Sequence, residues 1–478
     1  MQTLLVCFVG KGTVMVFSSL IFIFVYLSIV LPVYYICPKK FRNAFLFAAS
    51  LVFYGYGEPV FILLMLVSVT MNYIFGILMG KYSEDRKKAK ALLVLNVVLN
   101  LGLLGFFKYA AFFVDTLKII PLFSGLEAPE IPLPIGISFY TFQTMSYTID
   151  VYKGNCKVQK NFVALGTYVA LFPQLIAGPI VMYADVENQL MHRTENWDKF
   201  TRGVKLFMVG LAKKVLIANQ MGNLWAELKP DTESGLIGAW IGIIAFTLQI
   251  YFDFSGYSDM ARGLGNMLGF DFLKNFDFPY ISKSITEFWR RWHISLGTWF
   301  REYVYIPLGG NRCKPLRHVF NIMAVWFLTG MWHGASWNFI LWGVYFGVIL
   351  LVEKYFLLKR LEKLPAAFSH VYALFLIILG WAIFDFTDIT LMGQYIASMF
   401  SLENGLLSAE ATPLVLGYLP LIAVGWFMSL PVARKVILKV FSVKGGWVLE
   451  TVACVVVLLL CVASLVSSSY NPFLYFRF

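Results

Sequence analysis

Apolar runs long enough to cross a lipid bilayer recur along nearly the whole of this 478-residue chain. About 20 helical residues, at about 1.5 Å rise each, span the roughly 30 Å hydrocarbon core of a membrane. Hydrophobic residues make up 59% of the sequence and charged residues 14%, whereas an ordinary soluble domain has about 45–50% and about 25%. We therefore predict an all-α protein that crosses the membrane many times.

Hydropathy predicts about twelve crossings, together with re-entrant or interfacial helices. We expect residues 1–14 to be an N-terminal extension, residues 15–478 to form one transmembrane domain, and residues 470–478 to be a C-terminal aromatic tail. Membrane sequence follows the first apolar run directly, so we expect no removable signal peptide. The candidate segments are 16–37, 43–56, 60–79, 91–107, 133–151, 162–181, 204–225, 236–252, 319–333, 337–353, 370–386, 413–430 and 447–468.

Basic residues gather in one set of loops, and this pattern orients the chain. The loops 57–59, 121–131 and 387–412 contain no Lys or Arg. By the positive-inside rule the basic loops are cytoplasmic and both termini lie outside. The net charge of +12 therefore indicates membrane orientation rather than binding of nucleic acid. The basic loops, with 22 Lys and Arg, are 39–42, 81–90, 153–160, 312–317, 354–363 and 434–444.

Several common sites are missing from the sequence. The six cysteines are scattered, with no pair at zinc-ligand spacing, so we predict no disulfide framework and no structural metal. We also expect no permanently bound cofactor. The chain has neither a GxSxG nucleophile elbow nor a phosphate-binding P-loop.

Of the five histidines, His333 has the most unusual setting. It ends an apolar run, in Gly330-Met331-Trp332-His333-Gly334-Ala335-Ser336-Trp337. An ionisable group at membrane depth is a functional candidate, and a neutral imidazole can act as a general base near pH 7. The alternative is a packing histidine that binds a backbone carbonyl.

Two other clusters carry polar groups near apolar runs. In Trp289-Arg290-Arg291-Trp292-His293 the aromatic and basic residues suit an amphipathic helix at the membrane interface, but anchoring alone does not need an imidazole. The segment 249–262 holds Asp253, Asp259 and Arg262. Carboxylates there are costly unless they are paired or face water, so an internal Asp–Arg pair that braces irregular backbone competes with a catalytic role.

Five ordered motifs together resemble the membrane-bound O-acyltransferase superfamily, in particular its bacterial branch that serves alginate O-acetylation. They are Leu133–Gln143, Phe172–Pro179, Tyr251–Asp259, Trp289–His293 and Gly330–Trp337. The resemblance implies a ring of tilted helices around a thinned centre with a tunnel. It also implies that His333 is the family's near-invariant histidine and that His293 is the second active-site position. We expect Asp253, Asp259, Trp289, Arg290, Trp332 and Asn338 to contact substrate.

The resemblance implies a bacterial inner-membrane enzyme that takes acetyl groups from cytoplasmic acetyl-CoA. The final acceptor would be an exported polysaccharide such as alginate, cellulose or peptidoglycan, reached through a periplasmic acetyltransferase partner. Two alternatives remain: D-alanyl transfer to teichoic acid by the same fold, and a transporter or flippase with a relay of intramembrane Asp and His residues.

The C-terminal tail, Asn471-Pro472-Phe473-Leu474-Tyr475-Phe476-Arg477-Phe478, is unusually aromatic. One interpretation is an aromatic belt at the outer membrane surface. The tail also resembles the terminal motif of related envelope-acylating systems, in which a tyrosine carries the acyl group. That resemblance implies that Tyr475 is a covalent acyl relay near His333 or His293.

Overall fold

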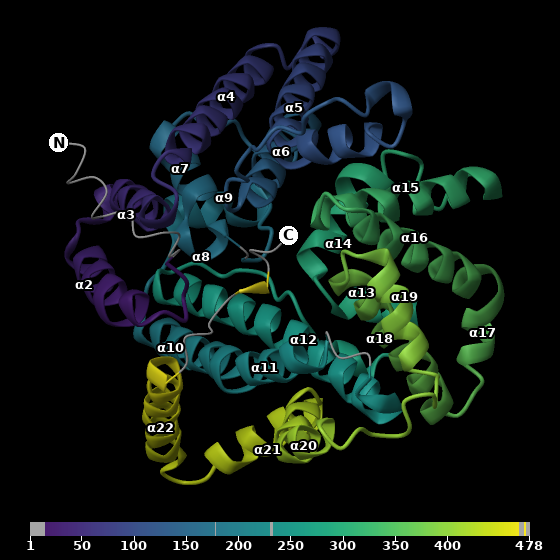
Figure 1. Ribbon diagram of the computed structural model, residues 1–478. Coiled ribbons are helices and arrows are strands. Elements are labelled where there is room, and N and C mark those ends of the chain that lie inside the picture. Colours follow the sequence, from purple (N-terminus) through teal and green to yellow (C-terminus); the bar gives the residue numbers. More distant parts are fainter. Residues whose placement is uncertain (1–14, 177, 230–232, 468–472, 475–478) are drawn as a thin grey trace. The chain divides into compact units, whose positions relative to one another are not determined.

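The computed structural model describes residues 15–176, 178–229, 233–467 and 473–474, and all regular elements within these ranges are helices (Figure 1). The all-α prediction is confirmed. Seven helical segments among the described residues are long and apolar enough to cross a membrane, which confirms a multi-pass membrane protein. They are Phe61–Lys81, Arg86–Leu117, Gly235–Met267, Trp337–Leu361, Ala366–Asp385, Ala411–Met428 and Gly446–Ser467.

The chain forms two compact units, and two of its helices contribute residues to both. Unit 1 comprises the chain up to Phe207 together with Met260–Leu273. Its complete helices are η1 (Ile21–Tyr26), α2 (Leu27–Ile36), η2 (Lys39–Phe41), α3 (Arg42–Gly57), α4 (Phe61–Lys81), α5 (Arg86–Leu117), η3 (Pro121–Phe123), α6 (Ile137–Lys153), α7 (Phe162–Ala170), α8 (Phe172–Leu175) and α9 (Tyr183–His192).

Helices α4, α5 and α6 of unit 1 pack against one another (Figure 1), and buried amide side chains join them. Asn72 of α4 and Asn100 of α5 exchange two hydrogen bonds of 3.1 Å. Asn96 donates to Asn72 at 3.0 Å, and Thr148 of α6 donates to Asn96 at 2.8 Å. Because lipid offers no hydrogen-bonding partner, such polar contacts hold membrane helices together.

The predicted crossing 162–181 is wrong, because the helix is broken twice within it. Helix α7 ends at Ala170, and after Leu171, whose backbone ψ is 112°, the four-residue α8 follows. Residues 179–182 have no helical structure. Pro173 accounts for the first break because proline has no backbone N–H to continue the helix and its ring clashes with the carbonyl four residues earlier, whereas it is tolerated in the first turn of α8.

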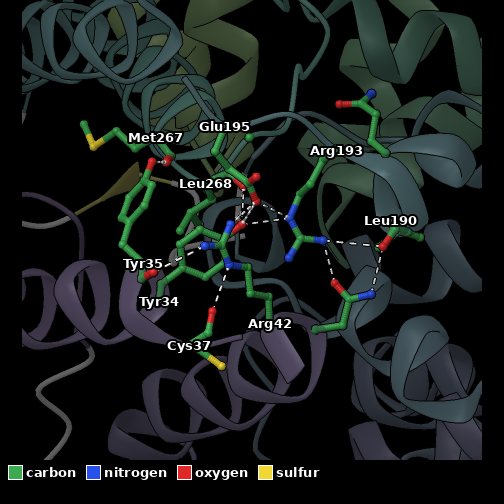
Figure 2. A network of polar contacts seen from close by, with 12 residues as sticks. Tyr34, Tyr35, Cys37, Arg42, Leu190, Arg193, Glu195, Met267 and Leu268 are labelled. Carbon is green, nitrogen blue, oxygen red and sulfur yellow. Dashed lines mark hydrogen bonds and ion pairs between the residues drawn. The ribbon is translucent and has the colours of Figure 1, made fainter. Parts of the chain in front are cut away.

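A network of charged and aromatic side chains ties together distant segments of unit 1 (Figure 2). Glu195 accepts a hydrogen bond from Tyr34 at 2.7 Å and pairs with Arg42 at 2.8 Å. Arg193 donates to Tyr34 at 2.8 Å and to Asn43 at 2.6 Å. The network joins the end of α2, the start of α3 and the segment after α9.

Unit 2 comprises Met208–Asp259 and the chain from Lys274 onward. The helices α10 (Trp197–Ala212) and α12 (Gly235–Met267) contribute to both units. The others of unit 2 are η4 (Lys213–Ala218), α11 (Asn219–Leu228), η5 (Pro279–Ile281), α13 (Ile285–Arg291), α14 (Ile294–Phe300), η6 (Arg301–Tyr305), α15 (Pro315–His333), α16 (Trp337–Val352), η7 (Glu353–Leu357), α17 (Leu358–Leu361), α18 (Ala366–Asp385), α19 (Ile389–Ser398), α20 (Ala411–Met428), α21 (Pro431–Phe441) and α22 (Gly446–Ser467).

Two glycines let α15 and α16 approach closely. A Cβ on Gly330 would lie 2.3 Å from the carbonyl oxygen of Phe339, and one on Gly343 would lie 2.3 Å from that of Trp326. Small residues permit this kind of contact between membrane helices. The close packing fixes the end of α15, where His333 lies.

Candidate active site

His333 is the last residue of α15 and is buried among aromatic rings of unit 2. The helix stops there because Gly334 adopts extended backbone. The ring centroid of the imidazole lies 5.0 Å from that of Trp342 and 5.2 Å from that of Phe384. The side chain is 6% exposed, so the histidine is shielded within the unit.

His293 occupies a sharp corner between α13 and α14. Its backbone has φ 46° and ψ 51°, in the left-handed region that few residues other than glycine adopt. A continuous interfacial helix through this motif is therefore contradicted, and the imidazole is buried at 2% exposure. Burial lowers the pKa of His293 to about 3, which keeps the ring neutral at physiological pH.

Trp332 contacts both imidazoles. Its ring centroid lies 5.8 Å from that of His293 and 5.1 Å from that of His333. Phe254 of α12 also packs against His293, with ring centroids 4.7 Å apart. The two histidines that the sequence singled out thus share one aromatic cluster.

Two buried side chains that sequence reasoning missed hold the His293 corner. Asn275 accepts hydrogen bonds through Oδ1 from the Ser295 amide at 3.0 Å and hydroxyl at 2.9 Å, and through its carbonyl from the Ile294 amide at 3.0 Å. It thereby caps the start of α14. No motif marked this residue, since a lone Asn in a loop gives no sequence signal for what it caps.

Glu353 of η7 holds the start of α13, the helix that leads into this corner. Its carboxylate is fully buried and accepts hydrogen bonds from the backbone amides of Ile285 and Thr286 at 2.7 and 2.8 Å. The Thr286 hydroxyl donates a third at 2.6 Å. The sequence could not predict this contact. Glu353 is at the end of an apolar run, beside a basic loop, and its partners are 67 or more residues away in the chain.

A small cavity lies against His333. Its volume is about 10 Å³, which is room for about one water molecule. A histidine and a carboxylate in a wall that is otherwise aromatic and aliphatic can hold a small polar group away from bulk water. The lining residues are Ile250, Asp253, Phe254, Trp292, His333, Trp342, Trp381, Phe384 and Leu474.

Asp253 binds both a lysine and the C-terminal segment. One carboxylate oxygen pairs with Lys214 at 2.6 Å, and the other accepts a hydrogen bond from the Leu474 amide at 2.8 Å. Next to this contact, Phe473 stacks on Tyr257 with ring centroids 4.5 Å apart. Phe473 and Leu474 are 2% and 3% exposed, which contradicts a membrane-surface belt for these two residues. Tyr475 lies outside the described residues.

The acidic cluster of α12 has regular backbone rather than the irregular backbone we expected, because Gly235–Met267 is one helix of 33 residues. Asp259 pairs with Lys213 at 2.6 Å. Both aspartates thus form ion pairs with lysines of η4. Asp253 lines the cavity, whereas Asp259 is not among the lining residues.

The remaining predicted substrate contacts are not among the residues that line the cavity. Asn338 is fully buried and donates to the carbonyl of Phe384 at 2.8 Å, so it packs beside a lining residue. Trp289 packs edge to face on Trp342 at 5.4 Å. Arg290 is exposed and is not brought to the cavity. Among the described residues, no group of three or more His, Cys, Asp or Glu is placed to hold a metal ion.

Residues 157–383 match the family model of the membrane-bound O-acyltransferases, MBOAT. The chain is 39% identical to the "Probable alginate O-acetylase AlgI" of Azotobacter vinelandii, over 97% of the chain and 100% of that relative. It is 35% identical to the peptidoglycan O-acetyltransferase of Helicobacter pylori, over 71% of each protein. A more distant relative, at 29% identity over 46% of the chain and 59% of the relative, is the teichoic acid D-alanyltransferase of Bacillus subtilis.

Proposed function

Because the chain belongs to the membrane-bound O-acyltransferase family, and is thus an acyltransferase of the membrane, we propose that it moves acetyl groups from cytoplasmic acetyl-CoA across the membrane. The acetyl groups would O-acetylate an exported cell-envelope polysaccharide. The observation that carries the proposal is the small cavity in which His333 lies beside Asp253 and Leu474. It joins an acid–base group to the C-terminal segment that would carry the acetyl group onward.

The proposed topology explains why the reaction needs a membrane enzyme. Acetyl-CoA is highly charged and confined to the cytoplasm, while the polysaccharide outside has no soluble acyl donor. A reactive centre within the membrane moves the acetyl group alone. The basic loops, which we place on the cytoplasmic side, would attract the phosphates of the coenzyme.

In the proposed reaction His333 acts as general base. The imidazole takes the proton of an attacking hydroxyl, whose oxygen bonds to the thioester carbonyl carbon. The tetrahedral intermediate then collapses, the carbon–sulfur bond breaks, and the imidazolium returns the proton to the thiolate as coenzyme A leaves. His293, kept neutral by burial, helps by orienting the acyl carbonyl.

The acceptor inside the protein would be Tyr475, which follows a residue of the cavity wall. Leu474 lines the cavity with His333, and its backbone is fixed by Asp253. A phenol has a pKa of about 10 and is a weak nucleophile unless a base activates it. An acetyl-phenol ester is reactive enough to pass its acetyl group to a hydroxyl of a periplasmic acetyltransferase partner.

Purified protein in liposomes, incubated with acetyl-CoA, tests these roles by mass spectrometry of the C-terminal peptide. We expect acetyl on Tyr475 in the wild type and none in Tyr475→Phe. His333→Ala should acetylate the peptide about 10²–10⁴ times more slowly, as for loss of a general base. The matched control is His192→Ala, because His192 is exposed at the end of α9.

Near wild-type acetylation by folded His333→Ala would overturn the base assignment. Full export of acetyl groups by Tyr475→Phe in cells would overturn the relay. Replacing acetyl-CoA by a D-alanyl carrier protein tests which acyl donor the enzyme uses. Transfer from that donor, with none from acetyl-CoA, would replace acetylation by the reaction named for the teichoic acid relatives.

A further inference from the structure

The indole of Trp342 carries a hydrogen-bond donor and lies in the cavity wall against the imidazole of His333. It projects from α16, is 1% exposed and lines the cavity. The indole and the His333 imidazole meet edge to face, with centroids 5.0 Å apart and planes at 80°. Any group that His333 acts upon in the cavity is therefore also beside this ring.

The indole N–H of Trp342 is buried and has no hydrogen-bond acceptor among the described residues. A buried donor without an acceptor costs about 1–3 kcal/mol, and proteins rarely keep one without a reason. The space that this residue lines is the cavity, which has room for about one water molecule. A ligand oxygen in that space would satisfy the donor.

We propose that the Trp342 indole N–H binds the carbonyl oxygen of the acyl group during transfer and stabilises the negative charge that develops there. This role is additional to the base and the relay, and it rests on the proposed acyl transfer. As the hydroxyl oxygen bonds to the carbonyl carbon, the carbonyl electrons move to the oxygen, which the N–H then holds. When the carbon–sulfur bond breaks, the electrons return and the hydrogen bond weakens.

This assignment follows from the chemistry of the cavity wall. The transition state of acyl transfer carries negative charge on oxygen, and a fixed donor in a site shielded from water stabilises that charge without reorganisation. The carboxylate of Asp253 is an acceptor and its charge is paired with Lys214. A neutral donor such as an indole can therefore complement the oxyanion without adding a charge to the membrane interior.

The test is a substitution that removes only the N–H. Replacing Trp342 by β-(3-benzothienyl)alanine keeps the two fused rings and exchanges the N–H for sulfur, while Trp342→Phe removes the N–H together with one ring. Both proteins are assayed for acetyl-CoA turnover in liposomes. The control is Trp326→Phe, because Trp326 packs on Trp342 with centroids 6.1 Å apart but does not line the cavity.

Loss of one such hydrogen-bond donor lowers kcat by about 10²–10³ and leaves the KM for acetyl-CoA nearly unchanged, because the hydrogen bond forms in the transition state. We expect this result for both Trp342 variants, with wild-type kcat in Trp326→Phe. The pH profile of kcat should keep the wild-type midpoint in the benzothienyl protein, since that substitution leaves the general base in place. Normal turnover of the benzothienyl protein, or an equal loss in Trp326→Phe, would show that Trp342 acts by packing.

The test also separates this inference from the proposed function. If wild-type protein transfers no acetyl group from acetyl-CoA, or His333→Ala retains full activity, the proposed acyl transfer fails. If the wild type is active and His333→Ala is not, normal turnover of the benzothienyl protein overturns the role of Trp342 alone.

Discussion

Asn275 acts on His293 through the backbone that follows it. Its side chain and its carbonyl bind the two residues that follow His293, so the peptide after the left-handed residue cannot rotate. Backbone strain at functional residues persists only where neighbouring contacts hold it. Asn275 is therefore a positioning residue for the second histidine.

The first prediction concerns Asn275→Ala, which we expect to lower kcat by up to about 10²-fold, because small displacements of a positioning group have costs of that size. Asn275→Asp keeps the accepting oxygen and should restore most of the rate. In protein that already carries His293→Ala, Asn275→Ala should cost little more, since two changes that act through one group are not additive. A full further loss in the double variant would assign Asn275 a role independent of His293.

The sequence could predict His333 and His293 because an imidazole beside tryptophans in an apolar run is unusual in itself. It could not predict Asn275, Glu353 or Trp342. Their importance depends on partners that are distant in the chain, as with Glu353 and Thr286, or on a cavity that exists only in the folded unit.

At the scale of elements, α13 is held at both ends, so that the Trp289–His293 motif has a fixed place. Glu353 of η7 binds the first two amides of α13. At the other end, the Asp277 amide donates to the Arg291 carbonyl at 2.9 Å. A seven-residue helix is not stable alone, so these contacts and its buried face determine where it lies.

The second prediction follows from the first of these anchors. Glu353→Gln places an amide group against amide donors, and we expect it to cost about 1–3 kcal/mol of stability, as for a buried donor that loses its acceptor. The apparent melting midpoint of purified protein should fall and acetyl transfer should decrease with it. Glu362→Gln, at an exposed position after α17, is the matched control. An unchanged midpoint in Glu353→Gln would contradict the anchoring role.

The third prediction concerns the network of unit 1 around Glu195. Burial alone would raise the pKa of Glu195, but hydrogen bonds from Tyr34 and Arg42 and the charges of Arg42 and Arg193 together lower it below its usual 4.5. A carboxylate whose pKa is lower in the folded than in the unfolded protein stabilises the fold at pH values above the unfolded pKa. This stabilisation is lost as the pH falls through the pKa of the folded state. Glu195→Gln should therefore melt earlier than the wild type at pH 7.

The difference in melting midpoint between Glu195→Gln and the wild type should shrink as the pH is taken below about 4.5, the ordinary glutamate value. Glu84→Gln, in the exposed loop before α5, should show no pH-dependent difference. A constant gap for Glu195→Gln between neutral and acidic pH would show that the side chain contributes by packing rather than by charge.

The positions of helices could be predicted from the sequence wherever an apolar run was continuous, as for α4, α18 and α22. The prediction failed at 162–181, where hydropathy alone hid the effect of Pro173 on the backbone. The prediction of irregular backbone also failed at the acidic cluster of α12. Two lysines of η4 form ion pairs with its aspartates, so that a regular helix can contain both carboxylates.

At the scale of the whole molecule, the distribution of basic residues predicts which loops face the cytoplasm. The fourth prediction is that a cysteine at position 83, in the basic loop between α4 and α5, is shielded from an impermeant thiol reagent in intact cells. A cysteine at position 403, between α19 and α20, should react. Both sites are exposed, and the native cysteines must first be replaced. Labelling at 83 with protection at 403 would invert the topology.

The left-handed backbone at His293 also lowers the stability of the fold at the position of a candidate active-site residue. Glycine adopts this backbone conformation freely, whereas other residues pay about 1–2 kcal/mol for it. His293→Gly should therefore be more stable than His293→Ala by about 1 kcal/mol while both lack the imidazole. The chain gives up that free energy to keep a ring at the bend. A screen for heat resistance among variants of this protein that lack the imidazole would consequently favour glycine over alanine at position 293.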